Sequence, residues 1–419
     1  MKEKIEFLLL SLRANLLQTL FLLLVIFLPT QLGKHFWPDF SFVFGIRSDY
    51  LSPTLYFTDI IIFAIILTYL ISNGKKFLSF TNIFYLLPFA IGIFVAKNPH
   101  SFLYGFFKLT EFVVLGIIVA KKIKLNNKII QLFSLTVLFE SILAIAQFIN
   151  HGSLGSLLYF LGERNFTSLT PGVANASVNG QLILRPYATF SHPNVLAGFL
   201  VAGMVILLMA ISKTNKRSHK NYYLAVLVIG SIALFLTLSR TALFLWIVIL
   251  GIETIIKIKK RIKIFVGLVL ILLAVLFLIP FSPRYFFLRL SQESFVQRYD
   301  LAENALKVFI DYPLFGVGLN NYLYYVPSFL NSKVLLIQPP HNIYLLVLVQ
   351  SGILGFAVFT KFLLNTFKQI TKISRLNKRF FYYLFFSVLF LGFFDHYLIT
   401  LQQGQILLTL VLAFCWSKR

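Results

Sequence analysis

Cysteine is almost missing from this sequence, because Cys415 is the only one among 419 residues. A single thiol cannot form an intrachain disulfide, so cysteine use gives no information on the redox compartment. The sequence also lacks an Asp-x-Asp pair and any cluster of histidine and cysteine, the patterns that would predict a metal site. We therefore expect no metal and no other cofactor.

Charge is scarce as well. Charged residues make up 12% of the chain, whereas a soluble domain carries about a quarter. Hydrophobic residues make up 58%, and the mean hydropathy is +0.84. Apolar runs of roughly twenty residues recur along the chain, long enough to cross a hydrocarbon core of about 30 Å. The composition predicts an all-α, polytopic integral membrane protein.

Acidic residues are the rarest charged groups, with 14 Asp and Glu against 38 Lys and Arg, which gives a formal net charge of +24. In a soluble protein this excess would suggest a nucleic-acid partner. Here most of the basic residues fall at the termini and in short loops on one side of the expected spans, such as 121–124 and 257–263. The positive-inside rule then places both termini in the cytoplasm and the long loops outside. No nucleic-acid site is expected.

About twelve membrane-spanning helices are expected, and an even number returns the chain to its starting side. We expect one integral membrane domain over residues 1–419. The first apolar segment is long for a secretory signal, so it is expected to remain as an anchor. The expected spans are 14–33, 56–72, 78–96, 101–120, 129–149, 193–212, 222–238, 241–256, 264–281, 342–366, 380–398 and 401–416.

Three long polar segments, 34–55, 150–192 and 282–341, fall on the outer side of these spans. Loops that a rigid scaffold holds in place often carry function. In the first of them, aromatic residues that include Trp37 and Tyr50 indicate a belt at the membrane interface. The other two loops contain the candidate functional residues.

The 282–341 loop is expected to contain an amphipathic helix. We expect Arg298 to open this helix and Pro313 to follow its end. Glu303 and Lys307 stand at the favourable i, i+4 spacing on its polar side. The element is expected to lie on the outer membrane surface, above a cavity between spans. Its apolar face is expected to contain Leu301, Ala305, Val308 and Phe309.

His341 is the leading candidate for catalysis. It follows Pro339 and Pro340 and precedes an apolar helix, which puts an imidazole at the membrane edge. Histidine suits the removal of a proton from an attacking hydroxyl group near neutral pH. The other interpretation is a polar residue that marks the start of a helix. Asn342 is expected to cap that helix and to contribute to substrate binding.

Arg240 interrupts two apolar stretches that leave almost no loop between them. An arginine at the centre of a membrane helix costs about 2.5–3.5 kcal/mol on insertion scales, and the cost is smaller at the edge. The alternative is an arginine that sets topology, but an outward-facing turn is the wrong side for that role. We therefore expect Arg240 to be functional.

Arg298, Arg185 and His192 are also expected at the outer membrane edge. A guanidinium group binds phosphate oxygens through paired hydrogen bonds and stays charged at working pH. Together with Arg240, these arginines favour a lipid-borne phosphate substrate. For Arg185 and His192 two interpretations stay open, namely binding of phosphate or sugar and anchoring of the 150–192 loop.

Ionisable residues inside the expected spans offer another class of function, because such residues often mark transport pathways. Lys108 and Glu111 stand three residues apart and are expected to pair. Asp59, Glu140 and Asp395 are expected to stand alone. A proton path needs a connected chain of groups, so this pattern favours structural pairing or cavity lining over transport.

Several segments in the same order resemble parts of the bacterial O-antigen ligases and polymerases. Each segment is short, and the resemblance covers about residues 180–360. The similar segments are Arg185–Asn194, Thr237–Thr241, Arg298–Gly318 and His341–Gly355.

The resemblance implies a metal-independent, inverting glycosyltransferase of the GT-C kind in the bacterial cytoplasmic membrane. Its donor would be a glycan on undecaprenyl diphosphate, used on the periplasmic or outer face. Arg240 and Arg298 would bind the diphosphate, and His341 would activate the acceptor hydroxyl. The implied partners are the lipid-linked donor, a glycan or lipid-core acceptor and membrane lipids.

Two questions stay open at this point. Ligases of this kind transfer to the lipid A-core of lipopolysaccharide, polymerases transfer to another repeat unit, and relatives transfer to protein side chains. A secondary transporter or lipid flippase is the alternative from another class, based on the helical architecture and the acidic residues within spans. Such transporters typically show two related halves with interrupted helices, which we do not find in this sequence.

Overall fold

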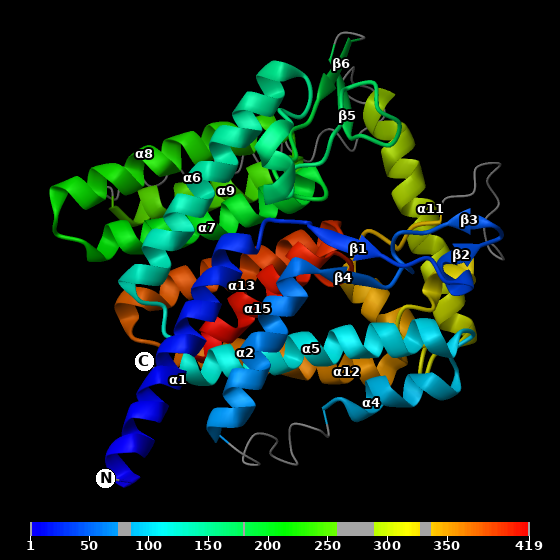
Figure 1. Ribbon diagram of the computed structural model, residues 1–419. Coiled ribbons are helices and arrows are strands. Elements are labelled where there is room, and N and C mark those ends of the chain that lie inside the picture. Colours follow the sequence, from blue (N-terminus) through cyan, green and yellow to red (C-terminus); the bar gives the residue numbers. More distant parts are fainter. Residues whose placement is uncertain (1, 74–84, 179–180, 258–288, 327–336, 418–419) are drawn as a thin grey trace.

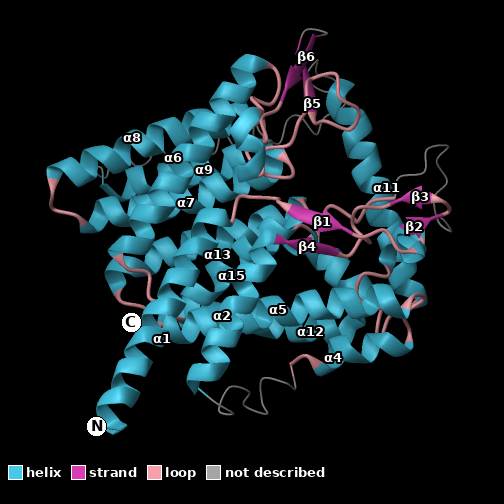
Figure 2. Ribbon diagram, viewed as in Figure 1, coloured by secondary structure: helices cyan, strands magenta, loops and turns pink. Residues whose placement is uncertain are grey.

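The computed structural model describes residues 2–73, 85–178, 181–257, 289–326 and 337–417. Its long elements are all helices (Figures 1 and 2). In Figure 1 the labelled termini lie toward one side of the molecule, and the short strands and α11 lie toward the other.

Some of the helices begin at a residue whose side chain caps them. The side chain of Asn98 accepts a hydrogen bond from the Ser101 backbone N–H before α5, and Asn126 does the same for Ile129 before α6. The helices are α1 (Lys2–Phe27), α2 (Phe57–Asn73), α4 (Leu87–Ala90), α5 (Pro99–Lys122), α6 (Asn127–Asn150), α7 (Pro193–Lys213), α8 (Arg217–Leu236), α9 (Arg240–Lys257), α11 (Arg289–Asp311), α12 (Ile343–Thr371), α13 (Arg375–Phe394), α14 (Tyr397–Thr400) and α15 (Gln402–Trp416), with short 3-10 turns at Asp39–Ser41, Ile91–Phe94, Ser156–Leu161 and Tyr322–Tyr324.

Five helices in the described part of the chain, α5, α6, α7, α8 and α12, are long and apolar enough to cross a membrane. Shorter apolar helices cover Asn15–Phe27, Phe57–Ser72 and Gln402–Trp416. This agrees with a helical membrane protein, but the number of twelve spans is not confirmed. The expected span 264–281 lies outside the described residues. The span 78–96 lies partly outside them, and its described part forms only α4 and the 3-10 turn after it.

Three antiparallel pairs of short strands go beyond what the sequence predicted. The β1–β4 pair closes the 34–55 segment at its base, and the β2–β3 pair forms a tight hairpin inside it. This segment is therefore an ordered structure rather than a loose interfacial loop. The pairs are β1 (Gly33–His35) with β4 (Thr54–Tyr56), β2 (Phe42–Val43) with β3 (Ile46–Arg47), and β5 (Asn175–Val178) with β6 (Gln181–Leu184).

Helix α7 is the most enclosed of the five candidate spans, with 83% of its apolar window buried inside the protein. It packs against α6, α8, α9, α13 and α15. Glycines permit this close packing, because a Cβ at Gly203 would collide with Val137 of α6 and one at Gly198 would collide with Tyr397. The segment that leads into α7 is therefore anchored on the best-packed helix of the bundle.

Helix α12 is broken at Gly352, whose φ of 63° lies in the left-handed region. The segment that follows α11 crosses α12 at this break. The backbone N–H of Val317 donates to the carbonyl of Val349 over 3.0 Å, and the N–H of Ile353 donates to the carbonyl of Pro313 over 2.9 Å. The crossing segment thus satisfies backbone groups that the interrupted helix leaves free. This explains why glycine is needed at position 352.

Helix α11 confirms the amphipathic helix predicted within the 282–341 loop. It starts at Arg289 rather than Arg298, so the expectation that Arg298 opens the helix is wrong. Glu303 and Lys307 form the predicted pair, with 2.6 Å between Oε1 and Nζ. Residues 282–288 and 327–336 of the loop lie outside the described residues, and the loop's boundaries stay a prediction. The residues buried on the apolar face are Leu301, Ala305 and Val308.

Charged groups among α2, α5 and α15 are paired. Lys108 Nζ lies 2.7 Å from Asp59 Oδ1 and 2.9 Å from Glu111 Oε2, and the Gln402 side-chain amide also donates to Asp59. The predicted pairing of Lys108 with Glu111 is confirmed, whereas the expectation that Asp59 stands alone is wrong. Buried carboxylates are stable only with such partners.

Glu140 of α6 also has partners, contrary to the expectation that it stands alone. Its carboxylate accepts hydrogen bonds from Thr189, over 3.1 Å from the backbone N–H and 3.0 Å from the hydroxyl group. Two turns further on, Gln147 Oε1 accepts from the backbone N–H groups of Tyr187 and Ala188 over 3.0 and 2.7 Å. Helix α6 therefore holds the segment that runs from Arg185 toward α7.

Candidate active site

His341 lies at the point where α12 begins beside the end of α13. Asn342 is the N-cap that the sequence predicted, because its Oδ1 accepts a hydrogen bond from the Leu345 backbone N–H over 2.9 Å. The Asn342 amide donates to the carbonyl of Phe393 over 3.1 Å. Both bonds fix the backbone next to His341, so its imidazole starts from a rigid position.

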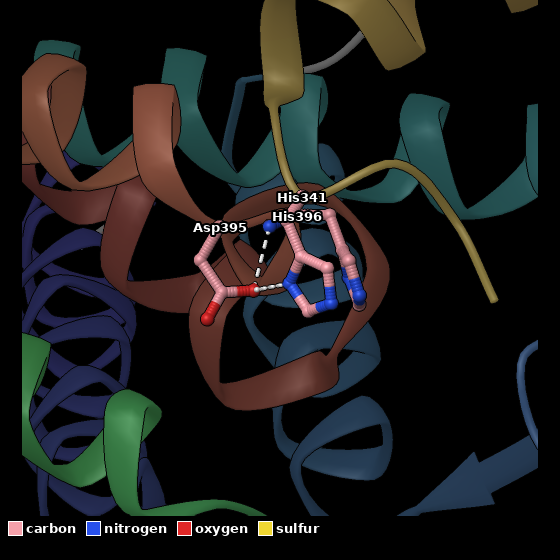
Figure 3. Close-up of side chains that lie close together, drawn as sticks. All are labelled: His341, Asp395 and His396. Carbon is pink, nitrogen blue, oxygen red and sulfur yellow. Dashed lines mark hydrogen bonds and ion pairs between the residues drawn. The ribbon is translucent and has the colours of Figure 1, made fainter. Parts of the chain in front are cut away.

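Asp395, the residue that ends α13, faces His341 directly. One of its carboxylate oxygens, Oδ1, lies 3.3 Å from His341 Nδ1 and accepts the backbone N–H of His396 over 2.8 Å (Figure 3). The side chain is buried, with 8% of the residue exposed. The expectation that Asp395 stands alone is therefore wrong. Because a carboxylate only accepts hydrogen bonds, it holds the proton of His341 on Nδ1 and leaves Nε2 with a lone pair.

The second oxygen of Asp395 connects this pair to Arg185. Asn194 Nδ2 donates to Asp395 Oδ2 over 2.8 Å, and Arg185 Nη2 donates to Asn194 Oδ1 over 2.6 Å. Arg185 Nε donates to the carbonyl of Thr237, at the start of the turn between α8 and α9, over 2.8 Å. A continuous hydrogen-bonded chain thus runs from Arg185 to His341.

Arg298 reaches the same place from α11. Its Nη1 donates to the carbonyl of Phe394 over 3.3 Å, one residue before Asp395. The residue is half-buried, so part of its guanidinium group stays accessible. Its remaining N–H donors are geometrically suited to an anionic group.

Arg240 is the first residue of α9 and is exposed. A three-residue turn separates it from α8, and Leu238 in this turn has a φ of 52°. Within the described part of the chain we find no hydrogen bond that joins Arg240 to His341 or Arg298. Arg240 and Arg298 both lie close enough to Arg185 for their charges to act on it. Arg240 and Arg298 are therefore both within electrostatic range of Arg185.

Arg185 and His192, the two candidate residues of the Arg185–Asn194 segment, differ in their charge at neutral pH. Burial lowers the pKa of Arg185 to about 10, and the charges of Arg298 and Arg240 act in the same direction. Arg185 still carries its charge at neutral pH. Burial lowers the pKa of His192 to about 3, with a further contribution from Arg185. His192 is therefore neutral, and its Nδ1 accepts the Asn194 backbone N–H over 3.1 Å as the N-cap of α7. A role for His192 in substrate binding stays a prediction.

His396 is the neighbour of His341 that sequence analysis missed. The two ring centroids lie 4.9 Å apart, and the His396 ring is also packed edge-on against Tyr50 at 5.4 Å. Tyr50 thus reaches the site through the 34–55 segment instead of only anchoring it at an interface. The adjacent Asp395 and His396 at the end of an apolar stretch were a signal for this site. We interpreted the carboxylate only as an isolated charge.

An apolar groove of about 440 Å³ lies between α9, α12 and α13, next to these polar residues. Phe244 lies one turn after Arg240, and Phe393 lies two residues before Asp395, so two of the lining residues are close in sequence to these polar residues. The residues that line the groove are Phe244, Leu245, Val248, Tyr344, Phe386, Leu389, Phe390 and Phe393.

A comparison with protein families agrees with this arrangement. A family model described as O-Antigen ligase matches residues 225–360, from α8 into α12. The matched stretch contains Arg240, Arg298 and His341, while Arg185 and Asp395 lie outside it. None of the curated proteins compared matches the chain. The segment 225–360 of this helical membrane protein is therefore similar to the O-antigen ligases.

Proposed function

We propose that this protein is a membrane glycosyltransferase that moves a glycan from undecaprenyl diphosphate to an acceptor hydroxyl group on the outer face of the bacterial cytoplasmic membrane. The observation that carries the proposal is the Asp395–His341 pair beside Arg185, Arg240 and Arg298. A base and a group of fixed cations are the two components that transfer from a diphosphate carrier requires.

His341 acts as the base in this proposal. Its Nδ1–H is held by Asp395, so Nε2 accepts the proton of the acceptor hydroxyl as the oxygen attacks the anomeric carbon. Such a base contributes about 10²–10⁴-fold to the rate. The attack forms the new C–O bond while the bond from the anomeric carbon to the diphosphate breaks. A single displacement of this kind inverts the anomeric configuration.

The arginines bind the diphosphate and stabilise the negative charge that grows on it as it leaves. Arg298 and Arg240 have guanidinium donors available, and Arg185 supports them through its charge. Preorganised cations of this kind stabilise the transition state more than the ground state. This is the task that a metal ion performs in many transferases. We therefore propose that transfer itself is metal-independent.

The apolar groove supports a lipid-linked donor. It has aromatic and aliphatic walls along α9, α12 and α13, and it begins one turn from Arg240. An isoprenoid chain in the groove would bring its diphosphate to the arginines at the membrane edge. The groove would thus hold the apolar chain of the substrate, and the arginines would hold its anionic headgroup.

Transport is less well supported by the buried charges. In the described helices, Asp59 and Glu111 share Lys108, and Glu140 is bound to Thr189. Asp395 belongs to the candidate active site. These groups form separate clusters, whereas a proton pathway needs a connected chain. Both the ligase and the polymerase activity fit the site, because they differ only in the acceptor.

A reconstituted reaction tests the proposal. Purified protein is incubated with glycan-loaded undecaprenyl diphosphate, EDTA and either a lipid A-core or a second loaded carrier. Release of the unloaded carrier together with an acceptor-linked product of inverted configuration is expected. The acceptor that gains the glycan distinguishes ligase from polymerase. Movement of the intact donor across a vesicle membrane, without bond cleavage, would refute the transferase and favour a flippase.

A further inference from the structure

A second imidazole stands beside the proposed base and has no part in the transfer step. The rings of His341 and His396 are tilted by 40° with centroids 4.9 Å apart. Figure 3 shows both rings next to the carboxylate of Asp395. One potential ligand atom from each of these three residues lies within 4.8 Å of the others.

The hydrogen bonds fix which ring nitrogens carry lone pairs. The Thr400 hydroxyl donates to the His396 carbonyl over 3.1 Å, so it accepts from His396 Nδ1–H over 2.7 Å. This leaves Nε2 of His396 without a proton. Asp395 has the same effect on His341. Both imidazoles thus present a bare Nε2, and a partner on the other nitrogen is the arrangement that orients histidine ligands in metal sites.

The spacing suits a small metal ion. Ligands about 2.1 Å from zinc in a tetrahedral site lie about 3.4 Å from one another. The 3.3 Å contact between His341 Nδ1 and Asp395 Oδ1 is the hydrogen bond that orients the His341 ring, so Nε2 is the ligand atom of His341. A ring nitrogen of His341 lies within 4.8 Å of one of His396, so a movement of roughly an ångström, which side-chain rotation can supply, brings the two imidazoles to that spacing.

We propose that Nε2 of His341 and Nε2 of His396 bind a borderline transition-metal dication such as Zn²⁺, with Asp395 orienting the His341 ring, and that this binding inhibits glycan transfer. Inhibition follows because the metal occupies the lone pair with which His341 would accept the acceptor proton. No bond is made or broken in the substrate, and no proton is released, because both Nε2 atoms are unprotonated. The inhibitory part of the proposal depends on the proposed function, whereas metal binding does not.

The surrounding charges define the kind of metal. Arg298 acts electrostatically on His396, and Arg185 acts on the neighbouring His192. Positive charge at these positions opposes any dication. Mg²⁺ and Ca²⁺ bind through charge and oxygen ligands, so the site excludes them. Zn²⁺ gains affinity from imidazole nitrogen, so it binds even though the nearby arginines repel a dication.

Binding is tested first without substrate. Titration calorimetry of the purified full-length chain should show one equivalent of Zn²⁺ bound, and Mg²⁺ should give no heat. His396→Gln should weaken Zn²⁺ binding at least tenfold, whereas the control His219→Gln, on the exposed start of α8, should leave it unchanged. Because His396 is buried, His341→Gln serves as a second variant at a more accessible position. Unchanged affinity in folded samples of both cluster variants would overturn the site.

Inhibition is tested next in the transfer assay. Zn²⁺ should stop transfer by the wild-type chain, and EDTA should restore it. His396→Gln should need at least tenfold more Zn²⁺ for half-inhibition, measured against its own uninhibited rate. Activation by Zn²⁺ would overturn the inhibitory role and assign the ion to catalysis. If Zn²⁺ binds but no acceptor gains a glycan under any condition, the metal site stands and the proposed function fails.

Discussion

At the scale of single residues, the base and its partner are far apart in the chain. Asp395 lies 54 residues after His341, yet its carboxylate fixes the imidazole and accepts a hydrogen bond from Asn194. The orientation of the proposed base thus depends on three separate segments. Substitutions that remove a charge and substitutions that only disturb an orientation should therefore give different kinetic effects.

His341→Ala should lower the rate of transfer by at least about 10²-fold, because the general base is lost. Donor binding should stay largely intact, because the base acts on the acceptor. Arg240→Ala or Arg298→Ala should instead weaken donor binding as well as turnover. Donor affinity and transfer rate, measured on the same preparations, distinguish these roles.

Arg217→Ala is the matched control for the arginine variants. Arg217 is exposed at the start of α8 and lies at the opposite end of that helix from the Arg240 turn. Its removal should change neither binding nor turnover. Equal loss of donor binding in the His341, Arg240 and Arg298 variants would contradict the separate roles that we assign.

Asp395→Asn should lower kcat by about one to three orders of magnitude with little change in KM, by analogy with carboxylates that orient a histidine base. The amide keeps the size of the side chain. However, its NH₂ group must face at least one of the N–H groups that donate hydrogen bonds to the Asp395 carboxylate. A similar fall in thermal stability and in KM would indicate a structural role and not the positioning of His341.

At the scale of elements, the 313–318 segment follows α11 and crosses α12 at its break. Its backbone hydrogen bonds join the two helices. Gly352 permits it because its backbone has a φ of 63° and because a Cβ at this position would collide with the carbonyl group of Leu314. Side chains with a Cβ fit neither the conformation nor the space. The fold here depends on a backbone contact that no hydrophobic pattern reveals.

Gly352→Ala should reduce the free energy of unfolding by more than about 3 kcal/mol, because backbone strain of about 1–3 kcal/mol is added to a collision with backbone atoms. Gly172→Ala is the matched control, because Gly172 also has a positive φ of 79° but nothing lies within 4 Å of its added Cβ. Thermal unfolding in detergent compares the two variants. Similar losses of stability in both variants would show that the collision of a Cβ at position 352 with its neighbours does not affect the free energy of unfolding.

At the scale of the whole molecule, much of the fold was predictable from hydrophobic length alone. Most of the long helices and the amphipathic α11 follow from apolar runs and their spacing, and so does the cap at Asn342. The strand pairs, the break in α12 and the Asp395–His341 contact were not predictable. They depend on backbone hydrogen bonds and on segments that meet only after the helices pack. Asp395 illustrates this limit, because its sequence neighbours describe a helix end and not its partners.

Lys108 provides a test of how the bundle tolerates buried charge. Lys108→Met should lower the free energy of unfolding by about 3–5 kcal/mol, because it leaves Asp59 and Glu111 as unpaired buried carboxylates. The triple variant with Asp59→Asn and Glu111→Gln should recover much of this loss. Lys307→Ala, which breaks the exposed pair with Glu303, should cost less than about 1 kcal/mol. Equal effects of the two lysine variants on melting temperature would refute the expected difference between the buried and the exposed ion pairs.

The crossing of the 313–318 segment at Gly352 also limits how the protein could open for the glycan of the proposed reaction. Backbone hydrogen bonds on both sides of the break lock α11 and α12 together, so Arg298 and His341 belong to one stiff unit. In the proposed reaction, substrate would then enter by movement of the Arg185–Asn194 segment, which α6 holds through Glu140 and Gln147. The proposed diphosphate-binding Arg298 and the proposed base His341 would keep a constant separation while the Arg185–Asn194 segment moves.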